Sequence, residues 1–561
     1  MKKTIILAFA ILFSFAVSAA DRTEKEMKAV ARQQLNKMMP VSTRGGGAGE
    51  VSKLTDSDFY SIYGTENAFV VVSKDTRHTP VLAYSAKPYK PDRIPCGLQW
   101  WFGAMEEALS ESVVQSVAMS PSVAVEPLLA TEWGQGNPFN LKCPTLNGEK
   151  APSGCVATAM SQVLNFFKYP ETGKGRGSYT VMGGFRPWSL TLGTTYHYDL
   201  LKNKYDETTL ANLTPEEEEA ISTLLLHCGA AVKMNYNSDG SGAYDYDATD
   251  GLATHFRYDS LAIHCYQRNH FTNDEWMQML LAELEARHPV IYCGQDPRAG
   301  GHAFVVDGVN NEGLVHVNWG WDGDCDGYYS LEGLTPKRTV GFSFGYNFSS
   351  GQSMIVGYKL QEKSDEQDEY HSFWASSTAY TLKASGSNFV VTDLGGFYNY
   401  NWLPFEGSIA LVFEEDKNNG QQYDIIFDEE KFGNYKGIRM WGYSSNSTDL
   451  IPFVLINNKQ IPAGNYKVFL GSKDIKENAY RPFRCGGGVG AIYFNVTKNP
   501  DGTFTLDGTR RQYITTGIVN TTTTRQPDGR IYDLNGRFVG WNKNSLPKGI
   551  YIINGEKVVI R

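Results

Sequence analysis

Cys155 lies in a segment whose pattern suits nucleophilic catalysis. Residues 152–160 read as a turn that leads into a helix, with Ser153 as the expected N-cap residue. One apolar stripe at helical spacing consists of Val156, Met160, Val163 and Phe167. Cys155 therefore falls in the first helical turn, where the helix dipole stabilises a thiolate. The alternative that stays open is a buried structural residue, because Cys is among the most buried residue types.

His302 has the setting expected of a base for that thiolate. It follows Gly300-Gly301 and opens the strand-like run 303–307, and glycines at a strand entry allow the backbone to approach a substrate chain. The other histidines lack this setting, and the sequence has no set of four ligands at zinc-like intervals. A thiol paired with an imidazole base is the arrangement of a cysteine nucleophile.

Three more residues would complete such a site. The chain turns at 310–313 after His302 and returns as a strand to Asn318, so a hairpin would bring Asn318 near the level of His302. Its amide would hold the imidazole by accepting the ring N–H, and Trp319 would cover that bond from water. Gln135, beside two glycines, is a candidate hydrogen-bond donor to an oxyanion. Taken singly, Asn318 is equally well explained as a turn residue, Trp319 as a core residue and Gln135 as a loop residue.

Taken together, residues 135–140, 154–159, 301–308 and 316–321 resemble the four motifs of the streptopain family, which are papain-like cysteine peptidases of bacteria. Order and spacing match, and the resemblance covers residues 125–362. It implies an α+β papain-like peptidase domain, endopeptidase activity and a preference for an apolar residue two positions before the cut. The roles it implies are nucleophile for Cys155, base for His302, oxyanion donor for Gln135 and orienting residue for Asn318, with Trp319 beside it.

The loop 237–242 resembles the Gly/Ser loop of that family, which lines the substrate cleft. The substrate-binding residues expected from this resemblance are Ser238, Gly240, Ser241, Gly242 and Gly301.

The first residues predict export. Residues 1–20 combine two lysines, an apolar run and a small-residue cleavage site, as in a secretory signal peptide. The run is too short to cross a bilayer, and the rest of the chain has no transmembrane candidate. We therefore expect a secreted protein, either free or attached to the cell surface.

Residues 21–124 are expected to form a separate α+β unit. The patterns predict a helix over 21–40, strands over 69–72 and 81–84, and a Trp-rich helix over 98–117. The unit resembles the inhibitory propeptide of the streptopain family, with cleavage expected in the linker 118–127. The predicted partners are thus the enzyme's own propeptide, as inhibitor, and protein or peptide substrates.

Residues 370–520 contain short apolar runs between clusters of Gly, Asn and Asp, which predicts one or more β-sandwich-like domains. Residues 525–561 have hairpin turns at Asn535-Gly536 and Asn554-Gly555. This last unit resembles the C-terminal sorting domains of proteins exported by the type IX route, so a type IX-like secretion machinery is a further expected partner.

Composition narrows the choice of function. A chain of 561 residues is too long for a single hydrophobic core. Its net charge of -9 provides no basic surface of the kind that binds nucleic acid. The eight cysteines are scattered from Cys96 to Cys485, and their pairing cannot be assigned. The turn 322–327 begins like a calcium loop, but Gly333 stands where the final acidic ligand is due, so neither a metal nor another cofactor is expected.

The sequence thus predicts a secreted cysteine endopeptidase made as a zymogen, acting on extracellular or host proteins. Two other functions remain open. The long β-rich half is compatible with a surface adhesin or haemagglutinin that carries a vestigial peptidase, although the intact Cys155, His302, Gln135 and Asn318 disfavour it. A Cys/His amidase acting on peptidoglycan is the second alternative.

Overall fold

The structure, a computed structural model, describes most of the chain from Asp21 onward. Outside the described residues lie the predicted signal peptide and the linker residues 111–123. Described are residues 21–38, 50–110, 124–181, 186–296, 300–331, 351–360, 373–376, 378–386, 388–393, 397–399, 405–416, 420–426, 453–455, 461–513, 531–533, 538–540, 548–553 and 556–560. None of the described helices is long and apolar enough to span a membrane.

The chain divides into two compact units, and the first contains the residues up to Tyr89. Its strands pair antiparallel in the order β1-β2-β3-β4, and Met27, Ala31 and Leu35 on one face of α1 form its core with strand residues. The predicted helix and the two later strands are confirmed, whereas the first two strands were not predicted. The elements are α1 (Glu24–Met38), β1 (Ser52–Asp56), β2 (Tyr60–Gly64), β3 (Phe69–Ser73) and β4 (Val81–Ser85).

The second unit begins at Lys90, so the Trp-rich helix α2 (Cys96–Ser110), which we predicted as part of the propeptide, packs within this unit. The remaining helices are α3 (Cys155–Phe167), α4 (Glu207–Ala211), α5 (Pro215–Ala231), α6 (Asp245–His255), the 3-10 helix η1 (Arg268–His270) and α7 (Asn273–Glu285). The strands up to residue 356 are β5 (Thr145–Leu146), β6 (Glu149–Lys150), β7 (Arg176–Val181), β8 (Trp188–Thr191), β9 (Asn235–Tyr236), β10 (His264–Gln267), β11 (Val290–Asp296), β12 (Gly300–Val309), β13 (Val315–Asn318), β14 (Gly327–Tyr329) and β15 (Gln352–Val356).

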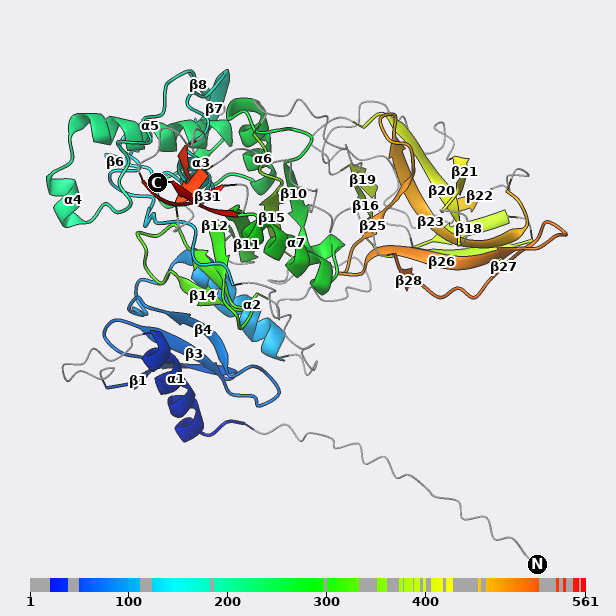
Figure 1. Ribbon diagram of the computed structural model, residues 1–561, viewed down its shortest axis with the longest axis horizontal. Helices are drawn as coiled ribbons and strands as arrows, with labels where there is room; N and C mark the ends of the chain where they lie inside the picture. Colours follow the sequence, from blue (N-terminus) through cyan, green and yellow to red (C-terminus); the bar gives the residue numbers. More distant parts are fainter. Residues whose placement is uncertain are drawn as a thin grey trace, which may run out of the picture. The chain divides into compact units, whose positions relative to one another are not determined.

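An antiparallel sheet and helix α3 form the centre of this mixed α+β region (Figure 1). The strand order is β14-β13-β12-β11-β15-β10, and α3 packs against β12 on one side and α5 on another. The predicted apolar stripe of α3 is buried, and the helix is buried along almost its whole length. Because α3 is enclosed by the core, its first residue is held firmly against the central strands.

The C-terminal part is rich in strands, drawn in yellow to orange in Figure 1. One sheet has the order β19-β16-β25-β26-β23-β20-β21, and a second has the order β17-β18-β22. A separate core of aromatic and aliphatic residues fills this region. Its strands are β16 (Trp374–Ser376), β17 (Thr381–Ser385), β18 (Asn388–Thr392), β19 (Phe397–Asn399), β20 (Gly407–Glu415), β21 (Gln422–Ile426), β22 (Phe453–Leu455), β23 (Gly464–Asp474), β24 (Arg481–Pro482), β25 (Arg484–Cys485), β26 (Gly490–Lys498), β27 (Phe504–Leu506) and β28 (Arg511–Gln512).

The last four strands form a small sheet of order β30-β29-β31-β32. The strands on either side of the two predicted turns pair antiparallel, β29 with β30 and β31 with β32. The turn residues Asn535-Gly536 and Asn554-Gly555 lie outside the described residues. The strands are β29 (Ile531–Asp533), β30 (Phe538–Gly540), β31 (Gly549–Ile553) and β32 (Glu556–Ile560).

A buried ion pair anchors the start of the peptidase region to β12. Asp307 is fully buried, and its carboxylate accepts from His316 Nδ1 at 2.6 Å and from the Leu129 backbone N–H at 2.8 Å. Burial alone would lower the pKa of His316, but the charge and hydrogen bond of Asp307, with the charges of Asp326 and Glu126, raise it. The pair therefore holds the segment around Leu129 most strongly when His316 is protonated.

We predict that His316→Gln destabilises the protein more at pH 5.5 than at pH 9. The folded pKa of His316 is raised, so its stabilising contribution is complete below the unfolded pKa and is lost as pH rises through the folded pKa. The loss at pH 5.5 should be about 1.5 to 3 kcal/mol, the value of a hydrogen bond to a charged group. Thermal unfolding of variant and wild type at both pH values measures it, and an equal loss at both would contradict the prediction.

Candidate active site

Cys155 is the first residue of α3, as predicted, but the N-cap is Gly154 and not Ser153. Gly154 has φ 90, a conformation that favours glycine, and a β-carbon there would lie 2.5 Å from the Met234 side chain. The Ser153 hydroxyl is turned elsewhere, 3.2 Å from Thr158 Oγ1. The prediction of Ser153 as cap is therefore wrong, because the tight turn before Cys155 requires a glycine at the cap position.

Strand β12 brings His302 to the start of α3. The Cys155 sulfur accepts hydrogen bonds from the backbone N–H groups of Ala303 and Val156. Ala303 follows His302 directly, so the predicted nucleophile and base lie on adjoining parts of one site. Burial raises the pKa of the Cys155 thiol, although these N–H groups act in the opposite direction. In this form of the protein the neutral thiol is favoured.

Asn318 lies at the end of β13, but it does not return to the level of His302. The register pairs it with Val305, because β12 and β13 already pair at Val309 and Val315 and the strand ends at Asn318. Its Oδ1 accepts from Gln162 Nε2 and from the Gly320 N–H, each at 3.0 Å. Asn318 therefore lies opposite Val305, three residues along β12 from His302, and the predicted position opposite His302 is wrong. The orienting role of Asn318 stays a prediction.

Trp319 lies deep in the site, with 2% of its surface exposed. Its ring centroid is 4.7 Å from that of Phe304 and 5.0 Å from that of Tyr329. Phe304 follows the His302–Ala303 pair on β12, so Trp319 packs beside the strand that carries the base. This position is compatible with the predicted shielding role, which stays a prediction.

The Gln135 segment lies next to the turn that precedes Cys155. The Gln135 carbonyl accepts from the Ser153 N–H at 3.0 Å, and the Gly134 carbonyl accepts from Thr158 Oγ1 at 3.2 Å. The Gln135 side chain is half-buried. Two hydrogen bonds thus fix the backbone of the predicted oxyanion donor against the nucleophile helix, while its role as donor stays a prediction.

The Gly/Ser loop also approaches the start of α3. Backbone hydrogen bonds between Asn235 and Gly242 close the loop, and a β-carbon at Gly154 would lie 3.1 Å from the Ser241 carbonyl oxygen. The Ser241 side chain is buried in this closed loop. The other residues predicted to bind substrate are exposed: Ser238, Gly240, Gly242 and Gly301.

Helix α2 packs against the same strands, which the sequence reasoning did not foresee. Gly294 on β11 pairs with His302, and a β-carbon at Gly294 would collide with the Trp100 ring. A β-carbon at Gly97 would lie 2.6 Å from the Trp319 ring. The α2 helix therefore covers the backbone position opposite His302. The sequence shows these two glycines and two tryptophans, but which glycine lies against which tryptophan depends on the fold.

Gln162 is a second residue that sequence reasoning missed. It is fully buried on α3, seven residues after Cys155, and it contacts Asn318. The available signal was a polar residue within an apolar helix, because a buried amide must find hydrogen-bond partners.

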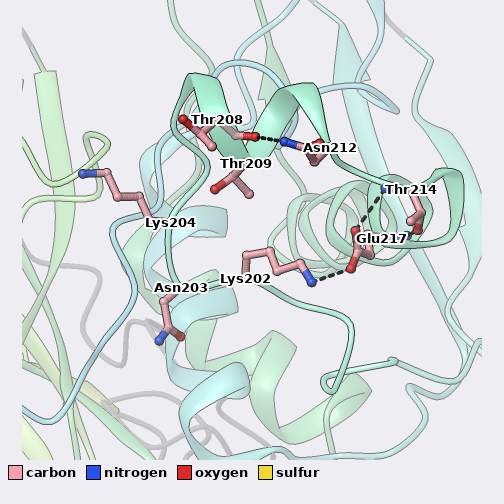
Figure 2. A pocket seen from close by; sticks show the side chains of 8 residues that line it. All are labelled: Lys202, Asn203, Lys204, Thr208, Thr209, Asn212, Thr214 and Glu217. Atoms are coloured by element: carbon pink, nitrogen blue, oxygen red, sulfur yellow. Dashed lines mark hydrogen bonds and ion pairs between the residues drawn. The ribbon is translucent and has the colours of Figure 1, made fainter.

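A surface hollow of about 430 Å³ lies apart from these residues (Figure 2). Lys202 is paired with Glu217, and Glu217 also closes the capping box of α5 with Thr214. The hollow thus offers mainly groups that already bind one another, and none of the predicted site residues lines it. Over the described part of the chain, no group of three or more His, Cys, Asp and Glu side chains is placed to hold a metal ion.

Comparison with known protein families identifies both the region around Cys155 and His302 and the segment that precedes it. The profile of the peptidase C10 family matches residues 133–329, and the profile of the Spi protease inhibitor matches residues 19–109. The inhibitor match includes most of α2 and the first match includes every predicted site residue.

Curated proteins of known name are also similar to this chain. Streptopain of Streptococcus pyogenes is 28% identical over 378 residues, which are 62% of this chain and 94% of that protein. The thiol protease/hemagglutinin PrtT of Porphyromonas gingivalis is 30% identical over 317 residues, and the match spans 52% of this chain but 36% of that protein.

Solved structures match as well. A prointerpain A fragment of Prevotella intermedia is 34% identical, covering 55% of this chain and 98% of that fragment, with a TM-score of 0.49. Active interpain A of the same organism is 38% identical, covering 44% of this chain and 100% of that protein, with a TM-score of 0.38. The two profile matches and the sequence similarity to streptopain therefore place residues 133–329 in the peptidase C10 family, the streptopain family of cysteine peptidases, with a Spi-type inhibitor segment ahead of them.

Proposed function

We propose that this protein is a secreted endopeptidase that hydrolyses peptide bonds of extracellular proteins, with Cys155 as nucleophile and His302 as base. The observation that carries the proposal is the contact of the Cys155 sulfur with the N–H of Ala303, the residue next to His302. A thiol at a helix start beside an imidazole is the arrangement that a cysteine nucleophile needs.

The proposed chemistry is acyl transfer in two steps. The Cys155 thiolate attacks the peptide carbonyl carbon, and the carbonyl oxygen becomes an oxyanion that the Gln135 side chain and a backbone N–H stabilise. Protonated His302 gives its proton to the leaving amine, and the acyl group stays on sulfur. His302 then takes a proton from water, which attacks the thioester and releases the acid. Asn318 orients the imidazole in this scheme.

The substrate side of the proposal rests on the Gly/Ser loop. Ser238, Gly240, Gly242 and Gly301 offer exposed backbone next to the nucleophile turn, which suits an extended peptide. The preference proposed is for an apolar side chain two positions before the cut. The papain-like domain would span residues 125–362.

Latency is proposed to depend on α2. This helix lies within the segment that matches the Spi inhibitor and packs on β11 across from His302. Burial in that state raises the pKa of the Cys155 thiol, so the nucleophile is kept protonated. Cleavage in the linker 118–127 would free the helix and the site, so residues 21–124 would be the propeptide.

The ends of the chain are proposed to serve export. Residues 1–20 would direct secretion, and residues 525–561 would be a sorting domain read by a type IX-like machinery, leaving the enzyme free or attached to the cell surface. The strands of residues 370–520 would form a β-sandwich-like domain. The four-stranded sheet β29–β32 supports a compact C-terminal unit.

An adhesin function is the second candidate, because the P. gingivalis relative is named both a thiol protease and a hemagglutinin, and this chain has a large β-rich region. Cell binding by a protein without peptidase activity would favour it.

We predict that Cys155→Ala and His302→Ala each lower turnover of a denatured protein about 10⁴-fold or more, because each removes a member of one catalytic unit. The assay uses reducing conditions, after an added protease has removed the N-terminal segment. Cys485→Ala is the matched control, since Cys485 is a buried thiol in the separate core of the C-terminal strands. Normal turnover by a folded Cys155→Ala protein would contradict the assignment.

We predict that Trp100→Ala weakens latency in the intact precursor. Removing this fully buried ring should loosen α2 and raise the rate of Cys155 alkylation by iodoacetamide about tenfold or more, since tenfold corresponds to only 1.4 kcal/mol. The precursor, its Trp100→Ala variant and the control all carry His302→Ala so that they cannot process themselves, and mass spectrometry follows the labelled peptide. Trp188→Ala, at an exposed position, is the control. Equal rates in all three would show that α2 does not restrain the nucleophile.

A further inference from the structure

Three buried side chains beside the candidate site form a closed set of hydrogen bonds. The Thr131 hydroxyl donates to Gln162 Oε1 at 2.6 Å, and Gln162 Nε2 donates to Asn318 Oδ1 at 3.0 Å. Asn318 Nδ2 then donates to the Thr131 carbonyl at 2.6 Å. We call these residues the Thr131–Gln162–Asn318 triangle. They expose 4%, 0% and 3% of their surfaces, so water does not compete for these bonds.

Two backbone groups fix the direction of the Asn318 amide. The Gly320 N–H only donates, so the atom it faces must be Oδ1, and the Thr131 carbonyl only accepts, so the atom it faces must be Nδ2. Gln162 must then present Nε2 to Oδ1 and keep Oε1 for the Thr131 hydroxyl. The amides of Gln162 and Asn318 therefore each have a single satisfied orientation.

The triangle joins the three segments that carry the predicted chemistry. Thr131 stands four residues before Gln135, and Gln162 stands seven residues after Cys155 on the same helix. Seven residues of helix are about 10 Å of rigid rise. Gln162 thus sets the distance between the start of the nucleophile helix and the end of β13, where Asn318 and Trp319 lie.

A buried glutamine in an apolar helix is costly unless its amide is paired. An apolar side chain at position 162 would pack in the same core without that requirement. The hydrogen bonds of Gln162 therefore favour a role beyond packing, in which the helix controls the amide of Asn318.

We infer that Gln162 is a positioning residue of the peptidase: through Thr131 and Asn318 it fixes the Gln135 segment and the end of β13 against the helix that begins at Cys155. This inference rests on the proposed function, in which Cys155 and Gln135 are catalytic. Loss of Gln162 removes one of the two donors to Asn318 Oδ1 and leaves the Thr131 hydroxyl without its partner, so the three segments gain freedom relative to one another. Small shifts of these segments misalign the groups that stabilise the Cys155 thiolate and the oxyanion.

The test compares matured wild type with Gln162→Met, which keeps the side-chain length but cannot donate. We expect kcat to fall about tenfold, or 1.36 kcal/mol, and KM to stay within about twofold. The pH profile of Cys155 alkylation by iodoacetamide should also move, with its acidic limb at higher pH, because that limb reports the thiolate–imidazolium pair.

Ser161→Ala is the matched control. Ser161 is equally buried on α3, next to Gln162, but its hydroxyl donates only within the helix, to the Thr158 carbonyl at 2.9 Å. It should leave kcat and the alkylation profile unchanged.

Thr131→Val is the second variant, because it removes the hydroxyl from the triangle and leaves the carbonyl. It should shift kcat and the alkylation profile in the same direction as Gln162→Met, but less. It serves as the test if Gln162→Met does not fold.

The outcomes separate this inference from the proposed function. If Gln162→Met, or Thr131→Val in its place, lowers the melting temperature but keeps the wild-type kcat and alkylation profile, Gln162 is structural and the inference is overturned, while the peptidase assignment stands. If matured wild type itself shows no Cys155-dependent turnover, the proposed function fails and the inference fails with it.

Discussion

The packing of the first turn of α3 against β12 is the constraint on which the rest of the site depends. A glycine cap with φ 90 starts the helix at Cys155, and the backbone N–H of Ala303 faces the sulfur. This one contact joins residues that are far apart in the sequence. The core around α3 keeps the contact rigid, so Cys155 and the neighbour of His302, our proposed nucleophile and base, are placed by a buried helix and a central strand.

The buried position of Cys155 and its proposed role in catalysis favour different protonation states. Burial raises the pKa of the Cys155 thiol, whereas catalysis needs the thiolate. Helix α2 covers the strands next to His302, with Trp100 over Gly294, and most of it lies in the segment that matches the inhibitor. In the proposed precursor this cover keeps the thiol in its neutral form until the N-terminal segment is removed.

The sequence allowed the peptidase family, helix α1 and helix α3 to be predicted, because apolar periodicity and the motif around Cys155 are local signals. The catalytic roles of Cys155 and His302 stay predictions. The predictions failed where contacts between segments far apart in the sequence determine the local structure. The cap is Gly154 because the preceding turn is tight, and Asn318 stops beside Val305 because the hairpin register is fixed near Val309. The contacts of α2 depend on tertiary packing, and no pattern within one segment predicts them.

The most direct test of the central claim is to find which thiol reacts with an epoxide inhibitor of papain-like enzymes. Matured protein is treated with the inhibitor, digested, and mapped by mass spectrometry over the seven cysteines that follow the proposed cleavage site. The account predicts a single adduct, on Cys155, which appears only after the N-terminal segment has been removed. An adduct on another cysteine with Cys155 unmodified, or equal labelling of Cys155 in the intact precursor, would contradict it.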